Sequence, residues 1–322
     1  MAKCQRCKAN SASLAGDSRV GRLAEDPKWR TLSTWGLKAW DALPAKSSCA
    51  PRVPLDLTGR DARCLEVFAG TGRVTQSWLD TGALADTPIE LFADPLSRKG
   101  PRQDHDVLRP EVQRALLAKA RSTPAARPTH WFIEFPCGSF CDWQLHNGGT
   151  RTFSDPAGHP EGPLWERDGT KLATFAASLY TAAADSGDVV VAENPAPSGR
   201  YPSAFDLPCW QTVLRRRDTL VVPMGLCEHG CGPVDAPDQR HRKRTWIVTN
   251  DPALSALSRR CSQNHVHAPL RGTRPGARFS RCTEAGEYTW QFAQAIADTC
   301  AISARALGAR FPHRARPATE RA

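Results

Sequence analysis

The chain has 322 residues, of which 40% are hydrophobic and 24% charged, a composition typical of a folded protein of one large or two small domains. No window approaches the ~20 apolar residues of a membrane span, and the N-terminus lacks the apolar segment of a secretory signal. We therefore expect a nuclear or cytoplasmic protein with no membrane association, whose twelve cysteines are reduced thiols.

The formal net charge is +10 and the pI is about 9.2. Such a balance suits a polyanionic partner such as nucleic acid, because attraction to phosphate is long-range. An arginine-rich protein from a GC-biased genome would show the same balance, so charge alone leaves both interpretations open. The sequence does not indicate an oligomeric state.

Helices and strands alternate along most of the chain. Residues 1–60 lack periodicity and are interpreted as an irregular extension, and the arginine-rich tail 308–322 is expected to be mobile. The predicted strands are 64–70, 89–95, 130–136, 188–195, 219–225 and 244–250, and the predicted helices are 73–83, 109–122, 170–187 and 287–307. The Gly- and Pro-rich segment 138–167 indicates a long loop.

This alternation predicts an α/β domain over residues 61–307, with a mostly parallel sheet and helices on both of its faces. A smaller loop-rich insertion is expected at 225–285. Ligands of such sheets lie beyond the carboxyl ends of the strands, so the residues that end the predicted strands are the candidates for function.

The stretch EVFAGTGR forms a G-x-G turn between a strand and a helix. Gly70 and Gly72 can adopt positive φ, and the helix N-terminus behind them offers free N–H groups to a ligand. A plain strand-to-helix turn would explain the same glycines, since the third glycine of the dinucleotide fingerprint is missing. Asp94 ends the second strand, where an acid can bond ribose hydroxyls. Asp106 could bond an adenine amine, or simply precede the helix that starts at Pro110.

Cys137 follows a proline at the end of the third predicted strand, in WFIEFPCGSFC. A cysteine on such a turn can have a lowered pKa and act as a nucleophile. Most free cysteines are instead small buried hydrophobes, and that alternative stays open for Cys137 alone. Glu193 and Asn194, in VVVAENP, end a neighbouring strand and add an acid and an amide to the same region.

At these residues the sequence resembles the cytosine-5 DNA methyltransferases. LEVFAGTG is similar to their first motif, FPCGSFC to their catalytic loop, AENP to their E-N-V motif, and RKRTWIVTN, preceded by Gln239, to their Q-x-R-x-R strand. YTWQFAQAIA is similar to the helix that closes their cofactor pocket. ENPAPS and RTFSDPAG resemble a divergent branch found in protist, viral and retroelement-derived sequences.

The resemblance implies a Rossmann-like methyltransferase fold and transfer of a methyl group from S-adenosylmethionine to carbon 5 of cytosine in nucleic acid, with DNA favoured over RNA. Cys137 would add to carbon 6, and Glu193 would bond ring N3 and the exocyclic amine. Asn194 would position the loop, while Arg242 and Arg244 would hold the flipped nucleotide. The implied cofactor-binding residues are Glu66, Phe68, Gly70, Gly72, Asp94 and Asp106, with Phe68 packed on the adenine.

Several positions depart from the family pattern. Phe135 replaces the usual proline before P-C, Cys141 replaces the last serine of the catalytic loop, and Pro195 replaces valine after the asparagine. The stretch between the 244–250 strand and the terminal helix is short, whereas the family places a large target-recognition domain there. Sequence-specific reading of duplex DNA is therefore not implied.

Two clusters of soft ligands, CEHGCG and CSQNHVH, lie in this shortened region. Cys227, Cys231, Cys261 and His265 form the simplest set for one tetrahedral zinc site, which would stabilise the insertion. The alternative is a set of thiols and histidines in loops that bind no metal.

Two other functions remain open. The chain could be an inactive relative that binds cofactor or nucleic acid, derived from a mobile element, or a zinc-stabilised nucleic-acid-binding module without enzymatic activity. The missing third glycine argues against a nucleotide-dependent oxidoreductase.

Overall fold

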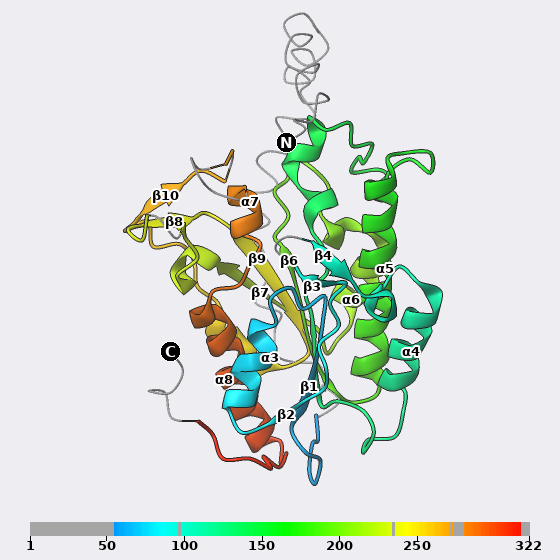
Figure 1. Cartoon of the computed structure of the whole chain (residues 1–322), viewed down its shortest axis with the longest axis vertical. Helices are drawn as coiled ribbons and strands as arrows, with labels where there is room; N and C mark the ends of the chain where they lie inside the picture. The colour runs from blue at the N-terminus through cyan, green and yellow to red at the C-terminus, as the bar shows by residue number, and fades with distance from the viewer. Residues whose placement is uncertain (1–54, 96–97, 234–235, 271, 274–279, 317–322) are drawn as a thin grey trace, which may run out of the picture. The chain divides into compact units, whose positions relative to one another are not determined.

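The computed structural model describes residues 55–95, 98–233, 236–270, 272–273 and 280–316, so the expected extension 1–60 lies almost entirely outside the described residues. Apart from 198–200, the described residues belong to one compact unit. Every helix and strand of the described residues lies in this unit (Figure 1).

Six strands form the main sheet, in the order β2-β1-β5-β6-β9-β7. They are β1 (Arg63–Val67), β2 (Leu84–Ala85), β5 (His130–Ile133), β6 (Val189–Pro195), β7 (Leu220–Gly225) and β9 (Arg244–Thr249). Five of them run in one direction, and β9, between β6 and β7, runs antiparallel to both neighbours. The amino end of β9 therefore lies at the same edge of the sheet as the carboxyl ends of the other strands.

Helices cover both faces of this sheet (Figure 1). One face carries α3 (Arg73–Asp80) and α8 (Trp290–Ala306), and the other carries α4 (Pro110–Ala120), α5 (Leu164–Asp185) and α6 (Pro208–Arg215). The strands β1, β5 and β6 are accordingly buried along nearly their whole length, as strands covered on both faces must be. The predicted Rossmann-like α/β fold class is confirmed.

Large aromatic side chains fill both sides of the sheet. Trp78, Phe132 and Phe292 belong to the core under α3 and α8. On the opposite side Phe135 stacks on Trp210, with ring centroids 5.0 Å apart and the planes 15° from parallel. Both Phe135 and Trp210 are fully buried, so the segment that leads into Cys137 is anchored by apolar packing.

A buried ionic cluster closes the opposite edge of the sheet, at the amino ends of β5 and β6. The Asp188 carboxylate, which is inaccessible to solvent, accepts hydrogen bonds from Arg60 at 2.8 Å, from Arg127 at 3.0 and 3.1 Å and from the Trp131 indole at 3.1 Å. A buried carboxylate with this many donors is a structural element, and its position far from the strand carboxyl ends separates it from the candidate site.

The strand predicted at 89–95 is shorter than expected and lies outside the main sheet. Only Phe92–Asp94 form a strand, β3, and it pairs antiparallel with β4 (Lys99–Pro101) in a separate two-stranded sheet. The unpredicted β2 takes the place beside β1, and contact with β1 resumes only at an isolated bridge to Ile89. Pro88 has no N–H to donate, which interrupts the ladder between these two points.

Several short elements were not predicted. The strands β8 (Gln239–His241) and β10 (Val266–Ala268) form a small parallel sheet, and α7 (Arg281–Glu284) precedes α8. The remaining elements are the 3₁₀ helices η2 (Gln103–His105), η3 (Gly138–Phe140), η4 (Asp142–Leu145), η5 (Ala204–Asp206), η6 (Leu226–His229) and η7 (Pro252–Leu257). Among the described residues, no helix combines the length and the apolarity that crossing a membrane requires.

The first part of the predicted mobile tail packs on the domain. The Phe311 ring lies 6.3 Å from that of Trp78 and beneath the Arg305 guanidinium. Arg310 forms a bridge with Asp61. A phenylalanine and a backbone bridge thus fix a segment whose arginine-rich composition suggested mobility.

Candidate active site

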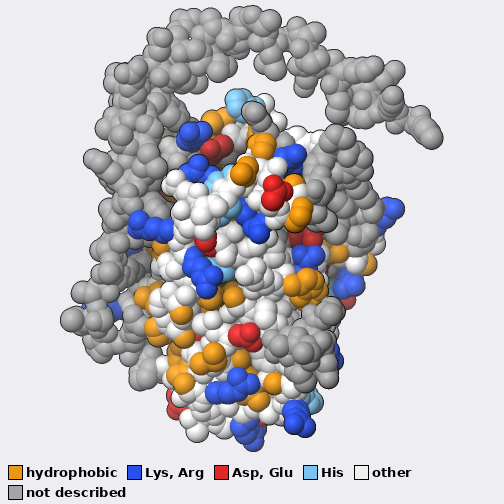
Figure 2. All heavy atoms as spheres, turned by 90° about the vertical axis from the view of Figure 1, so that its left-hand side faces the viewer, with side chains coloured by type: hydrophobic (Ala, Val, Ile, Leu, Met, Phe, Trp, Pro, Cys, Tyr) orange, Lys and Arg blue, Asp and Glu red, His pale blue; other side chains and the backbone are white. Residues whose placement is uncertain are grey.

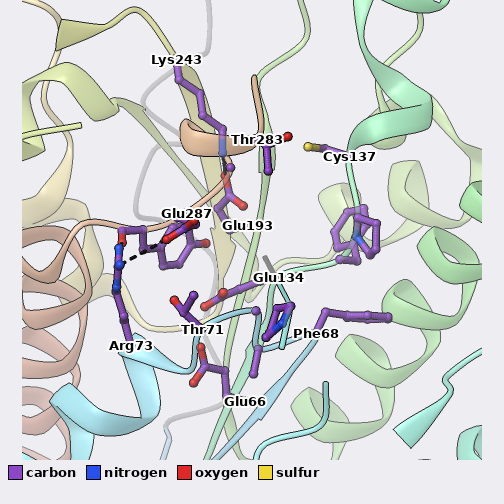
Figure 3. A pocket seen from close by; sticks show the side chains of 17 residues that line it. Glu66, Phe68, Thr71, Arg73, Glu134, Cys137, Glu193, Lys243, Thr283 and Glu287 are labelled. Carbon is purple, nitrogen blue, oxygen red and sulfur yellow. Dashed lines mark hydrogen bonds and ion pairs between the residues drawn. The ribbon is translucent and has the colours of Figure 1, made fainter. Parts of the chain in front are cut away.

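A cavity of about 220 Å³ opens at the carboxyl edge of the parallel strands. Its walls come from the turn after β1, the loop after β5, the end of β6, the residue before β9 and the link between α7 and α8. Five of the residues predicted from the sequence line it together, namely Glu66, Phe68, Gly70, Cys137 and Glu193. Figure 3 shows Cys137 and Glu193 reaching into the same space from different elements, with Glu66 deeper in the pocket.

Cys137 immediately precedes η3, and its side chain is partly exposed to the cavity. The expectation of a lowered pKa is wrong: burial raises the pKa of the Cys137 thiol, and the Glu193 charge raises it further. The positive charge of Lys243 acts in the opposite direction and lowers it. Helix η3 is a single 3₁₀ turn, and its N-terminus does not offset the cost of desolvating a thiolate.

The loop that carries Cys137 is held by the buried guanidinium of Arg151. Arg151 Nε donates to the Ser139 carbonyl at 3.1 Å, and its Nη2 donates to Ser139 Oγ at 3.2 Å and to the Glu166 carbonyl at 2.8 Å. Its Nη1 donates to the Pro156 carbonyl at 2.6 Å. The guanidinium also lies 3.8 Å from the centre of the Phe140 ring. One side chain thus joins η3, the 151–163 loop and the first turn of α5.

The close contact between this loop and α5 requires a glycine in the helix. A Cβ built on Gly169 would lie 1.9 Å from Ser139 Oγ, far inside contact distance. Gly169 therefore lets η3 approach the helix backbone, which accounts for a glycine in a helix interior. Neither Arg151 nor Gly169 was assigned a role from the sequence.

Glu193 forms the acidic part of the pocket beside a lysine that the sequence analysis missed. Glu193 Oε1 accepts a hydrogen bond from Thr245 Oγ1 at 2.9 Å and lies 3.6 Å from Lys243 Nζ (Figure 3). Burial disfavours the charged form of Lys243, but Glu193, Cys137, Cys231 and Glu134 together raise its pKa. Lys243 therefore stays charged next to the thiol and the acid.

The predicted basic residues do not line the pocket. Arg242 and Arg244 are exposed, and Lys243 between them points into the cavity instead. Asn194 is buried, and its Nδ2 donates to the Phe135 carbonyl at 2.8 Å. Asn194 thus connects the end of β6 to the segment before Cys137.

The glycine turn forms the floor of the pocket. Gly70 has a φ of +52° and Gly72 a φ of +68°, and a Cβ at either position would project into open space. Phe68 also has a positive φ, of 63°, a strained conformation for a phenylalanine that places its side chain at the pocket wall. Gly72 is the N-cap of α3 and lies outside the pocket lining.

Two carboxyl groups at the bottom of the pocket share a desolvated environment. Glu66 Oε2 accepts hydrogen bonds from Thr75 N at 2.7 Å and Thr75 Oγ1 at 2.5 Å, yet burial raises the pKa of Glu66 to about 7. Burial also raises the pKa of Glu134 well above its usual value, and the charges of Glu66 and Glu193 add to the shift. Burial therefore favours the protonated forms of both carboxyls near neutral pH.

Two further acids, Asp94 and Asp106, were predicted to bind the cofactor. Asp94 is the last residue of β3, and its side chain is outside the described part of the structure. Asp106 caps η2, where its Oδ1 accepts from Leu108 N at 3.0 Å, and it does not line the pocket. The carboxylate found beside the glycine turn is that of Glu90, whose Oε2 accepts from Gly70 N at 2.9 Å.

The predicted metal ligands come together in part. Cys227, Cys261 and His265 converge, and the fourth member of their cluster is His267 instead of Cys231. Cys231 is instead buried in the main core, where its carbonyl accepts a hydrogen bond from His241 N, at the end of β8, at 2.7 Å. This cluster lies outside the pocket lining.

No protein-family model and no curated protein matches this sequence. Among solved structures, the chain is similar to the Entamoeba histolytica methyltransferase EhMeth, with 10% identity, a TM-score of 0.32 and coverage of 60% of this chain and 54% of that one. It is also similar to the S. pombe Dnmt2 methyltransferase, with 11% identity, a TM-score of 0.30 and coverage of 63% and 56%. The chain spans little more than half the length of each.

Replacing Arg151 by lysine should loosen the loop that carries Cys137. Lysine has one donor group in place of the guanidinium fork, so the carbonyls of Ser139 and Glu166 would lose their partners. We expect the free energy of unfolding to fall by about 3 kcal/mol, measured by denaturant titration. The exposed neighbour Arg167, changed to lysine, should stay within about 0.5 kcal/mol of wild type. Equal stability of the two variants would contradict the role given to Arg151.

The raised pKa of Glu66 predicts a pH-dependent stability. A carboxyl whose pKa is higher in the folded state contributes stability that is complete below about pH 4.5 and is lost as the pH rises through about 7. Glu66→Gln keeps the acceptor for Thr75 but cannot ionise, so between pH 5 and 8 the variant should lose less stability than wild type, by on the order of 2 kcal/mol. Glu161→Gln, at an exposed position, should show the same slope of unfolding free energy against pH as wild type. Identical slopes for Glu66→Gln and wild type in denaturant titrations would refute the shift.

Proposed function

We propose that the chain is an S-adenosylmethionine-dependent methyltransferase that methylates carbon 5 of cytosine in nucleic acid, with DNA as the favoured substrate, through a covalent adduct with Cys137. The observation that supports this proposal is the shared cavity of Cys137, Glu193 and the glycine turn at Gly70. A nucleophile and an acid, carried by different strands, face the same space beside a turn suited to a cofactor.

The residues around the glycine turn fit S-adenosylmethionine. The missing side chain of Gly70 leaves room for a ligand against the backbone, Phe68 provides an apolar face, and Glu66 and Glu90 provide carboxyl groups close by. When bound, S-adenosylmethionine supplies an electrophilic methyl group. The chain's own residues must then make carbon 5 of cytosine nucleophilic.

Cys137 and Glu193 can do this together. Addition of Cys137 Sγ to carbon 6 forms a carbon–sulfur bond and moves the electron pair of the ring double bond toward carbon 5. A Glu193 carboxyl hydrogen-bonded to ring N3 and to the exocyclic amine stabilises the charge that develops on the ring. After carbon 5 has gained its methyl group, it loses its proton to solvent or a base, and departure of the sulfur from carbon 6 restores the aromatic ring.

The charge of Lys243 has a defined part in this scheme. Cys137 must lose its proton to attack, and burial opposes that loss. Lys243 is the pocket cation that lowers the pKa of the thiol, and it also lies 3.6 Å from Glu193. It therefore stabilises the thiolate without displacing the acid.

Nucleic acid is the substrate class that the charge distribution favours. The chain carries ten more basic than acidic residues, and Arg242 and Arg244 are exposed on either side of Lys243, where they could contact phosphates. A cavity of about 220 Å³ admits a single base and no duplex, so the target cytosine must be unpaired or flipped out.

Methyl transfer and adduct formation should both depend on Cys137. With tritiated S-adenosylmethionine, wild type should label cytosine-containing DNA, and it should form a denaturation-resistant adduct on oligonucleotides that contain 5-fluorocytosine. Cys137→Ser should lose both activities, the transfer rate by at least about a thousandfold. Cys141→Ser, four residues away and outside the pocket lining, is the matched control and should retain them.

The same assay should include single-stranded DNA, duplex DNA and RNA. Labelling of RNA alone would overturn the preference for DNA. Binding of S-adenosylmethionine with no transfer to any of the three would instead indicate a cofactor-binding relative without methyltransferase activity on cytosine.

Lys243→Met should shift the pH dependence of transfer. Without the lysine charge the pKa of Cys137 rises further, so the ascending limb of the pH–rate profile should move to higher pH and the rate at pH 7 should fall about tenfold. Arg242→Met, at the exposed neighbouring position, should leave the limb in place even where it weakens binding of nucleic acid. A Lys243→Met profile that superimposes on wild type would exclude this role for the lysine.

A further inference from the structure

Four soft side chains converge at the side of the domain that carries β8 and β10. Cys227 lies in η6, directly after β7, and Cys261 lies in the segment between η7 and β10. His265 precedes β10, and His267 is its central residue. Their ligand atoms all lie within 4.8 Å of one another, although they come from segments more than thirty positions apart in the chain.

The distances match those between ligands of one tetrahedral ion. Zn–S bonds of about 2.3 Å and Zn–N bonds of about 2.0–2.1 Å imply S···N separations of about 3.6 Å and N···N separations of about 3.3 Å. Cys261 Sγ lies 3.7 Å from His265 Nε2 and 3.4 Å from His267 Nε2, and the two Nε2 atoms are 3.1 Å apart. Both imidazoles therefore present the same type of nitrogen to the centre.

The surroundings orient one of these imidazoles as metal sites usually do. His265 Nδ1, opposite the clustered nitrogen, lies 3.0 Å from Asn264 Oδ1 and 4.0 Å from Glu228 Oε1. Glu228 Oε1 is itself held by Ser262, whose N and Oγ donate to it at 2.6 and 2.8 Å. An outer hydrogen bond of this kind fixes the ring orientation and leaves Nε2 for a metal.

We propose that Cys227, Cys261, His265 and His267 bind one zinc ion. Four protein ligands complete a tetrahedral coordination shell, so the site is structural and leaves no position for a substrate. Cys227 is buried and the other three ligands are partly exposed, which gives the ion a path from solvent. Figure 2 shows this side of the molecule, and the histidine side chains visible there lie mainly in its upper part, where β8 and β10 are found.

The ion would connect the end of β7 to β10, and through β10 to β8, with which β10 pairs in parallel. β8 leads directly to Lys243, whose carbonyl accepts from Leu226 N at 2.9 Å. In β8 and β10 only His241 and Ala268 are buried, so coordination would add stability to a small sheet that has little core of its own. The zinc site would thereby stabilise the position of β8 and of Lys243, which follows it and lines the pocket.

Metal content of the purified full-length chain tests this proposal. Protein expressed with added zinc should contain about one zinc ion per chain by elemental analysis. Cys261→Ser and His267→Ala should each lose most of it. Cys231→Ala removes a thiol that is buried in the main core and is not one of the four ligands. This variant should keep the zinc.

Cobalt substitution keeps the test independent of how well the variants fold. Wild-type protein loaded with Co²⁺ should show thiolate-to-metal charge transfer and the intense visible bands of a tetrahedral ion with two sulfur ligands. Chelation should lower the Tm of wild type by several degrees and leave that of His267→Ala unchanged. Wild-type protein that retains neither metal, or an octahedral cobalt spectrum, would overturn the proposal. Loss of zinc in Cys231→Ala but not in His267→Ala would overturn this ligand set.

Discussion

The buried guanidinium of Arg151 is the interaction on which the geometry of the pocket depends. The segment after β5 must leave the sheet, expose Cys137 to the cavity and return over α5, and it has little regular structure of its own. Arg151 satisfies carbonyls from three parts of this segment and packs on Phe140. A buried cation is costly unless it is saturated with acceptors, so the loop and the arginine specify each other's conformation. Gly169 permits their approach to α5, and the Phe135–Trp210 stack anchors the other end.

Within this frame, the pocket is acidic and contains a single lysine among its lining residues. Glu66, Glu134 and Glu193 surround Lys243 and Cys137, and burial drives the first two carboxyls toward their protonated forms. The fourth acid of the lining, Glu287, forms an ion pair with Arg73 at 3.2 Å, so the net charge of the pocket stays small despite its four acids. This arrangement also means that a ligand that brings positive charge would favour ionisation of Glu66 and Glu134. The sulfonium of S-adenosylmethionine would be such a ligand, and the proposed cofactor and the acidic pocket are therefore electrostatically compatible.

Most strands and helices of the α/β domain could be predicted from the sequence, because apolar strands and amphipathic helices are local patterns. β1, β5, β6, β7 and β9 and the helices α3, α4 and α8 lie close to where periodicity and end signals place them. The helix α5 begins at Leu164, six residues before its predicted start, so the prediction of a loop over 138–167 is wrong at its C-terminal end. The sequence also brought Cys137, Glu193 and Gly70 to one edge, since strand ends of a parallel sheet meet there. It did not predict β2, β8 or β10, which are two or three residues long and owe their conformation to neighbours distant in the chain. Arg151 was missed for the same reason, because its partners lie on three separate segments.

The position of Lys243 shows where a rule based on strand ends fails. The rule examines the residues that follow a strand. Because β9 runs antiparallel to β6, the residue before β9, Lys243, lies at the edge of the sheet that carries the pocket. Strand direction depends on which neighbours pair, and no local pattern in RKRTWIVTN records it. Once β9 is reversed, pairing places Ile247 opposite Glu193 and Thr245 opposite Pro195. The Thr245 hydroxyl then bonds Glu193, and Lys243, two residues before Thr245, follows on the same side of the strand while Arg242 and Arg244 face solvent. A single reversal of polarity thus decides which of three adjacent basic residues enters the pocket.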